Sequence, residues 1–395
     1  MDTGLECVNL VPWRWQKRTS TINKFSIIIT RVSDYQSFGN MRIAITADNH
    51  LTDKKKHPER WKTLENILND IREKDINKII ICGDLFNDDC HNYSEFDKLT
   101  DKYNNIDFLI IPGNHDPNIS EKAITGSNVT IYTEPEVISF NDSDYSFFFL
   151  PYKPKITMGQ QFVSYQEDLI PREWILISHG DWADSIRTPN PIEPDVYMPL
   201  SRKDIANYKP TLTILGHIHK PLDDTDYNVH YVGSPCGLDI TETGRRRYSI
   251  LDTKNLDLEH INVDSEVIYF DETINIWPME NEDEYLKNQI AKIKERWDLN
   301  SEEMSKAKIR IKIKGYSSNI RKLKDFCEKS FEGFSFWNNE KPDISEVYES
   351  YNYELLKITE KVVARIDQQS WVEIEGEPIK NEIISKAIKT IYSIS

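Results

Sequence analysis

The sequence has few cysteines and no long apolar run. Its five cysteines are scattered and form no CxxC pair, so a disulfide framework is not indicated, and we expect a reducing, cytoplasmic compartment. A membrane-spanning helix would need about 18 or more consecutive apolar residues, and no stretch approaches that length. We therefore expect no association with a membrane.

An excess of positive charge is also absent. The chain has 49 Lys and Arg residues against 65 Asp and Glu residues, which gives a net charge of −16. This balance excludes a protein that coats nucleic acid by bulk charge, but not an enzyme that grips it through a local basic patch or bound cations. No internal repeat or low-complexity tract is present, and 395 residues allow two or three globular domains.

The first 40 residues differ from the rest of the chain. They contain a short apolar piece, Phe25 to Thr30, but not the pattern of a secretory signal peptide. We expect residues 1–40 to be a loosely ordered extension or the product of a start codon assigned too early. The alternative is a segment that docks on the body of the protein or on a partner.

A regular alternation of strand and helix patterns begins at Met41. Apolar, mostly β-branched runs end in polar clusters at 42–50, 78–84, 107–116, 174–181 and 211–219. Helical patterns at Pro58–Lys74 and Tyr93–Tyr103 separate the first three runs, which is typical of βαβ units. Shorter strand patterns after residue 130 predict a mixed or doubled sheet. We assign residues 41–275 to one α/β domain.

The pattern changes after about residue 276. A helix pattern at 282–297, a strictly alternating strand at 306–315 and a second helix pattern at 318–331 predict a small α/β domain over 276–345. Two further apolar stripes at helical spacing follow in residues 346–395. They favour helices that either complete the core or dock onto a partner.

Five polar clusters stand at the carboxyl ends of the five predicted strands. They supply Asp48, His50, Asp84, Asn114, His115, Asp116, His179, His217 and His219. Because ligands bind beyond the carboxyl ends of strands in open α/β sheets, one topology can bring all five clusters together. Carboxylates, an amide oxygen and imidazoles suit two first-row cations such as Mn²⁺, Fe²⁺ or Zn²⁺, and two such cations can hydrolyse a phosphoester.

The order DxH, GD, GNHD, H and GHxH over residues 41–219 resembles calcineurin-like metallophosphoesterases. The resemblance implies a layered β-sandwich flanked by helices. It also implies that Asp84 bridges two metal ions and that His115 contacts the scissile phosphate, oriented by Asp116. In the same scheme, the first ion is held with Asp48, His50 and His219, and the second with Asn114, His179 and His217.

Later features resemble the SbcD-type DNA repair and recombination nucleases. These are GNHDP, GSPCGLD at 233–239, the ILD strand after Arg245–Arg247 and the KIRIKIKG strand. The resemblance implies a DNA-positioning cap at 276–345, terminal helices that bind an SbcC-type coiled-coil ATPase, and a homodimer. Richness in Ile, Asn and Lys is compatible with a virus-encoded version, in a bacterial or phage-infected cell. One departure is the Gly-Asp-Trp that follows His179.

Two basic groups are candidates for contact with DNA phosphates. Arg245, Arg246 and Arg247 follow the GSP motif, and one face of the alternating strand carries Lys306, Lys308, Arg310, Lys312 and Lys314. An ordinary solvated strand face is the alternative. The remaining histidines outside the motifs, His57, His91, His230 and His260, are expected to be surface or structural residues.

We therefore predict an Mn²⁺-dependent DNA exonuclease or endonuclease that works with an ATPase subunit. One alternative is a general phosphoesterase that acts on nucleotides or phosphoproteins. The other is a DNA-end scaffold with a vestigial metal site, which the intact set of ligands argues against.

Overall fold

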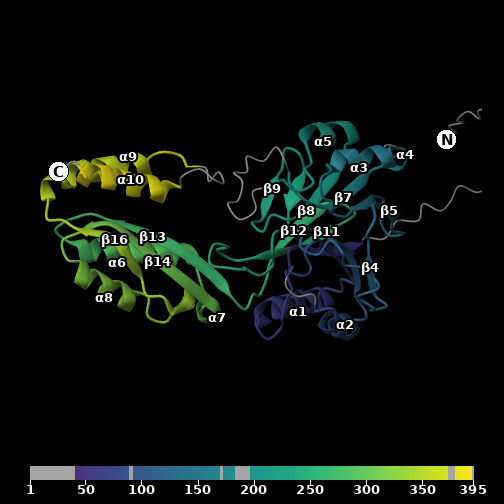
Figure 1. The fold of residues 1–395 in the computed structure, drawn as a ribbon, viewed down its shortest axis with the longest axis horizontal. Helices are drawn as coiled ribbons and strands as arrows, with labels where there is room; N and C mark the ends of the chain where they lie inside the picture. The colour runs from purple at the N-terminus through teal and green to yellow at the C-terminus, as the bar shows by residue number, and fades with distance from the viewer. Residues whose placement is uncertain (1–40, 89–91, 170–171, 183–195, 372–378, 394–395) are drawn as a thin grey trace, which may run out of the picture. The chain divides into compact units, whose positions relative to one another are not determined.

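The computed structural model describes residues 41–88, 92–169, 172–182, 196–371 and 379–393 (Figure 1). The predictions for residues 1–40 and for His91 lie outside these ranges. Within the described ranges, no helix is both long and apolar enough to cross a bilayer.

Two six-stranded sheets form the first part of the described chain. The first has the order β12-β11-β1-β2-β3-β4, in which the last four strands are parallel and β11 is antiparallel to both neighbours. Its strands are β1 (Arg42–Thr46), β2 (Lys78–Cys82), β3 (Asp107–Ile111), β4 (Val129–Ile131), β11 (Arg247–Asp252) and β12 (Asp257–Asn262).

The second sheet has the order β5-β6-β7-β8-β10-β9, with four parallel central strands and an antiparallel strand at each edge. Its strands are β5 (Glu136–Ser139), β6 (Ser146–Leu150), β7 (Trp174–His179), β8 (Leu212–Gly216), β9 (Leu222–Asp224) and β10 (Val229–Tyr231). Strands β1, β2, β7 and β8 are buried along nearly their whole length, as their continuous apolar runs predict.

The inner faces of the two sheets pack on each other, and helices cover the outer faces. Ile45 and Ile80 of the first sheet share an apolar cluster with Phe147 and Ile177 of the second. The outer face of the first sheet is covered by α1 (Pro58–Glu73) and α2 (Tyr93–Lys102). That of the second is covered by α3 (Met158–Phe162), α4 (Gln166–Leu169) and α5 (Arg202–Tyr208). The predicted layered sandwich flanked by helices is confirmed.

A third, parallel sheet follows in the chain. Strand β14 (Ala307–Ser317) is flanked by β13 (Ile268–Ile276), β15 (Ser335–Phe336) and β16 (Asp343–Glu349). The helices of this part are α6 (Glu282–Trp297), α7 (Ser301–Lys306), α8 (Ile320–Ser330), α9 (Leu356–Asp367) and α10 (Lys380–Ser393). The boundaries at 275 and 345 stay predictions; β13 and β16 each span one of them.

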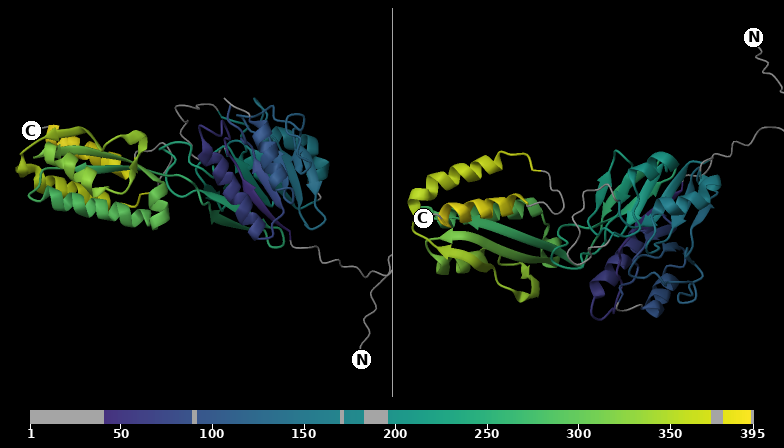
Figure 2. Two further views of the ribbon diagram at one scale, coloured as in Figure 1. Left: turned by 90° about the horizontal axis from the view of Figure 1, so that it is seen from below. Right: turned by 45° about the horizontal axis from the view of Figure 1, so that its top comes forward.

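The alternation in β14 decides how its two faces are covered. Ile309, Ile311 and Ile313 are buried against α6 and α8, while α9 and α10 lie over the opposite face, as Figure 2 shows. The prediction that Lys306 lies on this strand is wrong. Lys306 ends α7, because Asn300 forms a capping box with Glu303 and starts a helical turn that runs as far as Lys306.

Replacing Ile313 by Ala tests how much this small apolar core contributes to the stability of the protein. Ile313 is 1% exposed, so the loss of its side chain should leave a cavity and lower the free energy of unfolding by about 2–5 kcal/mol. Lys308→Ala, at an exposed position of the same strand, should change it by less than about 0.5 kcal/mol. Urea denaturation measures both, and equal losses would contradict the assigned packing.

Candidate metal centre

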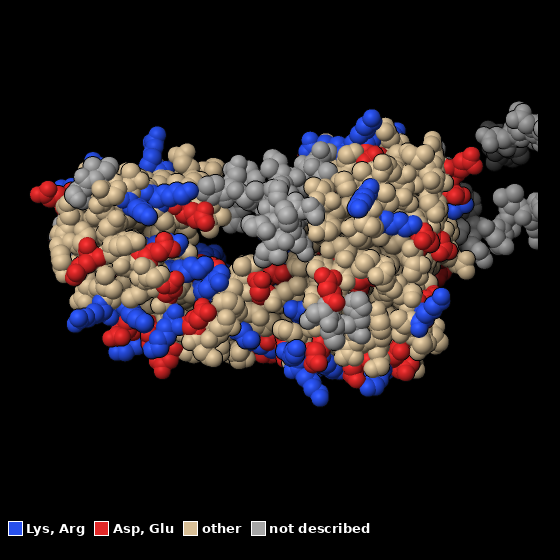
Figure 3. All heavy atoms as spheres, viewed as in Figure 1, with Lys and Arg blue, Asp and Glu red and all other residues tan. Residues whose placement is uncertain are grey.

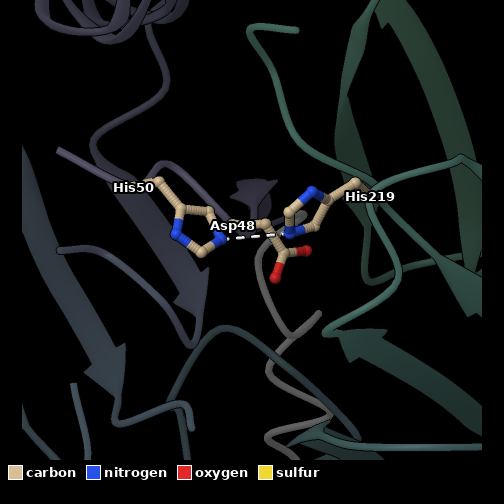
Figure 4. Close-up of side chains that lie close together, drawn as sticks. All are labelled: Asp48, His50 and His219. Atoms are coloured by element: carbon tan, nitrogen blue, oxygen red, sulfur yellow. Dashed lines mark hydrogen bonds between the residues drawn. The ribbon is translucent and has the colours of Figure 1, made fainter. Parts of the chain in front are cut away.

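The predicted polar residues meet where parallel strands of both sheets end. Asp48 and His50 follow β1, Asp84 follows β2, and Asn114 follows β3, all in the first sheet. The second sheet contributes the last residue of β7, His179, and the two histidines that follow β8, His217 and His219. Figure 4 shows three of these side chains directed at one another: Asp48 and His50 from the segment after β1, and His219 from the segment after β8.

Asp84 lies between two groups of candidate ligands. In the first group, His50 Nε2 is 3.0 Å from His219 Nε2, and the ligand atoms of Asp48, His50 and His219 all lie within 4.8 Å of one another. In the second, the ligand atoms of Asp48, Asp84 and His179 lie within the same distance. The Oδ2 atom of Asp84 is 3.7 Å from His50 Nε2 and 3.3 Å from His179 Nε2.

Asn114 completes the second group. Its Oδ1 atom is 2.8 Å from His179 Nε2 and 3.0 Å from His217 Nδ1. The structure thus brings together all seven predicted ligands, and the donor set fits two divalent cations that share a carboxylate. Asp84 Oδ2 is buried and accepts no well-oriented hydrogen bond from the described residues, which is the state expected of a metal ligand.

The turns out of the strands hold unusual backbone conformations. Asp48, His50, Asp84 and His217 all have positive φ angles, of 50°, 43°, 49° and 94°. Gly83 has φ of 86°, and a Cβ atom there would come within 2.2 Å of His179 Nδ1. Non-glycine residues with positive φ store strain, which the surrounding structure must overcome to aim these side chains inward.

Burial and neighbouring charges set the protonation of the cluster. Burial raises the pKa of Asp48 to about 6 and lowers the pKa of His50 to about 3. Burial alone would raise the pKa of Asp84, but His179 and His50 outweigh it and hold that pKa below its ordinary value. At neutral pH Asp84 is therefore a carboxylate and His50 a neutral imidazole, the forms in which they bind metal ions.

Each of three histidines is held from behind by an oxygen atom. His50 Nδ1 lies 3.2 Å from Asn87 Oδ1, His179 Nδ1 lies 2.9 Å from the Cys82 carbonyl oxygen, and His219 Nδ1 lies 2.6 Å from Glu242 Oε1. Such partners fix the ring and direct its other nitrogen into the site. All three rings have their Nε2 atoms toward the carboxylate cluster.

The sequence analysis missed Glu242. Its Oε2 atom accepts hydrogen bonds from Ser234, Leu238 and Arg246, so the carboxylate is saturated by donors. Burial would raise the pKa of Glu242, but His219 and Arg246 lower it to about 2. Glu242 lies three residues after the GSPCGLD motif, and this is the feature of the sequence that could have drawn attention to it. No spacing rule, however, links that position to His219.

Comparison with known proteins agrees with this geometry. Residues 41–261 match the family model of calcineurin-like phosphoesterases. The chain belongs to this family. Members bind divalent metal ions, and the chain has the candidate residues for them. No curated protein matches it.

Two solved structures are similar to this calcineurin-like phosphoesterase in part. One shares 13% sequence identity with a TM-score of 0.37, and the similarity covers 56% of this chain and 99% of the other. The second, the protein TT1561 of Thermus thermophilus, shares 11% identity with a TM-score of 0.38 over 56% and 99% of the two chains.

The role predicted for Asp116 in this phosphoesterase stays a prediction. Asp116 is buried, and its two oxygen atoms accept hydrogen bonds from the backbone N–H groups of Gly113 and Phe86, at 2.8 and 3.1 Å. These two hydrogen bonds connect Asp116 to two loops of the site. Burial and the charge of Asp84 raise the pKa of Asp116 to about 7. The carboxylate beside His115 is Asp88, with Oδ1 3.1 Å from His115 Nδ1.

The predicted basic groups are largely matched by carboxylates. Arg245 pairs with Glu303, and Arg247 pairs with Asp223. Arg246 is only 4% exposed, because it lies beneath Glu242, so the prediction that it contacts DNA is wrong.

The same matching extends to the third sheet. Lys306 pairs with Asp264 and Glu302, Arg310 and Lys312 with Asp271, and Lys314 with Glu346, while Lys308 is exposed. Figure 3 shows acidic and basic side chains interspersed over this part of the surface. DNA contact by the accessible members of the set stays a prediction.

Asp271 gives a pH-dependent test of this charge matching. Burial would raise its pKa, but the hydrogen bonds from Arg310 and Lys312 lower it below 3.8. A carboxyl group with a lowered pKa stabilises the folded state above its ordinary pKa and loses this effect as the pH falls below it. Asp271→Asn should therefore lower the free energy of unfolding by about 1 kcal/mol at pH 7, and by less at acidic pH.

Urea denaturation at pH 7 and below pH 3.8 measures the difference. The matched control is Asp264→Asn, since Asp264 also pairs with a lysine of this group but is 66% exposed. Exposed pairs contribute little, so this control should differ from the parent by only a few tenths of a kcal/mol. An effect of Asp271→Asn that stays constant with pH would contradict the assigned pairing.

Proposed function

We propose that this phosphoesterase is a DNA nuclease of SbcD type that uses two divalent cations, preferably Mn²⁺. The observation that carries the proposal is the double cluster around Asp84, with buried carboxylate, amide and imidazole atoms directed at one another. Asp48, His50, Asp84 and His219 would hold one cation. Asp84, Asn114, His179 and His217 would hold the other.

Bound cations would supply Lewis acidity and a water molecule of lowered pKa. The side chains of the protein would position the reacting groups and transfer the proton. The other carboxylate oxygen of Asp84, Oδ1, accepts the backbone N–H of His115 at 2.8 Å. This hydrogen bond would keep the Asp84 carboxylate in place between the two groups of ligands. That bond also fixes the loop that carries the His115 side chain.

His115 is placed to transfer a proton. Its side chain is 20% exposed, more than the buried side chains of His50 and His179, and its ring centre lies 4.8 Å from that of His50. A substrate phosphate beside the cluster would therefore reach His115 from the solvent side. Asp88, next to Nδ1, would orient the ring so that Nε2 donates a proton to the departing oxygen.

One observation favours a second candidate, a phosphoesterase for small substrates. The basic residues that would hold duplex DNA are mostly paired with carboxylates. Cleavage of linear duplex DNA and of a small diester such as bis(p-nitrophenyl) phosphate, each with Mn²⁺, separates the two candidates. If the protein cleaves neither substrate with Mn²⁺, the remaining alternative is the DNA-end scaffold with a vestigial metal site.

We also propose that α9 and α10 bind a coiled-coil ATPase of SbcC type. Three apolar side chains here are exposed: Ile358 in α9 by 51%, Trp371 after α9 by 38% and Ile379 before α10 by 50%. Their exposure supports an apolar docking surface. Size-exclusion chromatography of the chain with such an ATPase tests this pairing, and the chain alone tests for a homodimer.

His115→Ala separates chemistry from metal binding. Loss of the proton donor should lower kcat for Mn²⁺-dependent hydrolysis by about 10²–10⁴-fold, while the number of bound Mn²⁺ ions stays the same. His57→Ala is the matched control, because His57 is a 43% exposed histidine paired with Glu59. Unchanged hydrolysis by His115→Ala would exclude His115 as the acid.

Glu242→Gln tests the support behind His219. The amide oxygen keeps a hydrogen bond to Nδ1 but loses the negative charge, so affinity for Mn²⁺ should fall by about 10–100-fold. Isothermal titration of the metal-free protein measures the change. Asp239→Asn in the same loop is the control, since the Asp239 carboxylate accepts hydrogen bonds from Thr241 instead of supporting a histidine. Equal affinities for both variants would contradict the role of Glu242.

A further inference from the structure

A second group of metal-ligating side chains lies outside the phosphoesterase centre. Asp223 belongs to β9, His230 to β10 and His260 to β12. Strands β9 and β12 are edge strands of the second and first sheets, so the group joins the two sheets at one side of the sandwich. The sequence analysis assigned both histidines only surface or structural roles.

Three ligand atoms converge in this group. His230 Nδ1 lies 2.9 Å and His260 Nε2 lies 3.3 Å from the same carboxylate oxygen, Asp223 Oδ1. The three ligand atoms all lie within 4.8 Å of one another. Ligand atoms bound to one tetrahedral Zn²⁺ at about 2.0–2.1 Å each lie about 3.3–3.4 Å apart, which is close to the two distances to Asp223 Oδ1.

Each potential ligand is also held on its far side. The Nε2 atom of His230 lies 3.0 Å from Asn228 Oδ1. Because the Asn228 amide nitrogen donates to the Thr211 carbonyl, the amide oxygen must face the ring, and Nε2 is the protonated nitrogen. His230 Nδ1, which faces Asp223 Oδ1 at 2.9 Å, would then be the nitrogen that binds a cation.

The other two ligands have similar support. His260 Nδ1 lies 2.9 Å from Ser249 Oγ, which leaves Nε2 directed at Asp223. Arg247 donates to both oxygens of Asp223 at 2.9 Å and so fixes the plane of the carboxylate. Although burial would raise its pKa, His230, His260 and Arg247 hold the pKa of Asp223 well below its ordinary range. Hydrogen-bonded imidazoles and an oriented carboxylate are the outer support found at metal sites.

We propose that Asp223, His230 and His260 form a separate site for one borderline first-row cation, with Zn²⁺ as the expected ion. Two imidazole nitrogens and one carboxylate oxygen favour Zn²⁺ over Mn²⁺ or Mg²⁺, and solvent can supply the fourth ligand. Without the ion, Asp223 is held only by its contacts with the two imidazole rings and with Arg247. The cation would bind β9, β10 and β12 together, and its stabilising effect does not depend on the proposed nuclease activity.

Counting Zn²⁺ ions on the full chain tests the site. With the phosphoesterase centre saturated by Mn²⁺, dialysis against micromolar Zn²⁺ followed by elemental analysis should give one more Zn²⁺ per chain than His260→Ala or His230→Ala binds. Zn²⁺ should also raise the thermal midpoint of the parent protein but not that of these variants. His57→Ala, which removes an exposed histidine elsewhere, should keep the extra ion.

Two results would overturn the proposal. One is an equal Zn²⁺ content in the parent and both variants. The other is anomalous scattering from Zn²⁺-soaked crystals of the parent with no peak between the three side chains, a measurement that does not depend on whether the variants fold. Mn²⁺-dependent hydrolysis should be the same in the parent and His260→Ala, so failure of this site and failure of the proposed nuclease are distinguishable.

Discussion

The structure depends on the arrangement of buried metal-ligating side chains around one carboxylate, Asp84. Removing this carboxylate from water is unfavourable, and the neighbouring positive charge and the backbone N–H of His115 offset the cost. His179 is one source of that charge, since burial lowers its pKa but Asp84 and Asp48 outweigh this and raise it to about 9. A divalent cation at this position would supply positive charge to the same carboxylates, so we expect it to have a large effect on the cluster.

The same contacts join the two sheets. Asp48, which follows a strand of the first sheet, accepts the backbone N–H of His217 from the second at 2.9 Å. His179 of the second sheet reaches the Cys82 carbonyl oxygen of the first. The site is therefore part of the sandwich interface rather than an addition to its surface. A change that separates the sheets by a fraction of an ångström would displace ligands on both sides at once.

The sequence predicted features that local patterns encode. Continuous apolar runs indicated the buried strands, a helical spacing of apolar residues indicated α1, α2 and α6, and residue type indicated the ligands. Prediction from the sequence failed for contacts between positions that no sequence pattern links. Asp116 was assigned to His115 through the family resemblance, yet the structure places Asp88 Oδ1 3.1 Å from His115 Nδ1. Glu242 was missed because it reaches His219 from a loop 23 residues further along the chain, and Asp223 because the pairing of β9 with β10 places it beside His230.

The distribution of charge bears on how such a chain would approach a phosphodiester. Its net charge is −16, and the basic residues expected to attract DNA mostly lie beside carboxylates. Within about a Debye length the net negative charge would repel a polyanionic substrate, and at longer range salt screens this repulsion. Attraction must then arise locally, where bound cations would outweigh the buried carboxylates of Asp48 and Asp84. Such cations would contribute to substrate binding as well as to hydrolysis, so removal of the metal should weaken both.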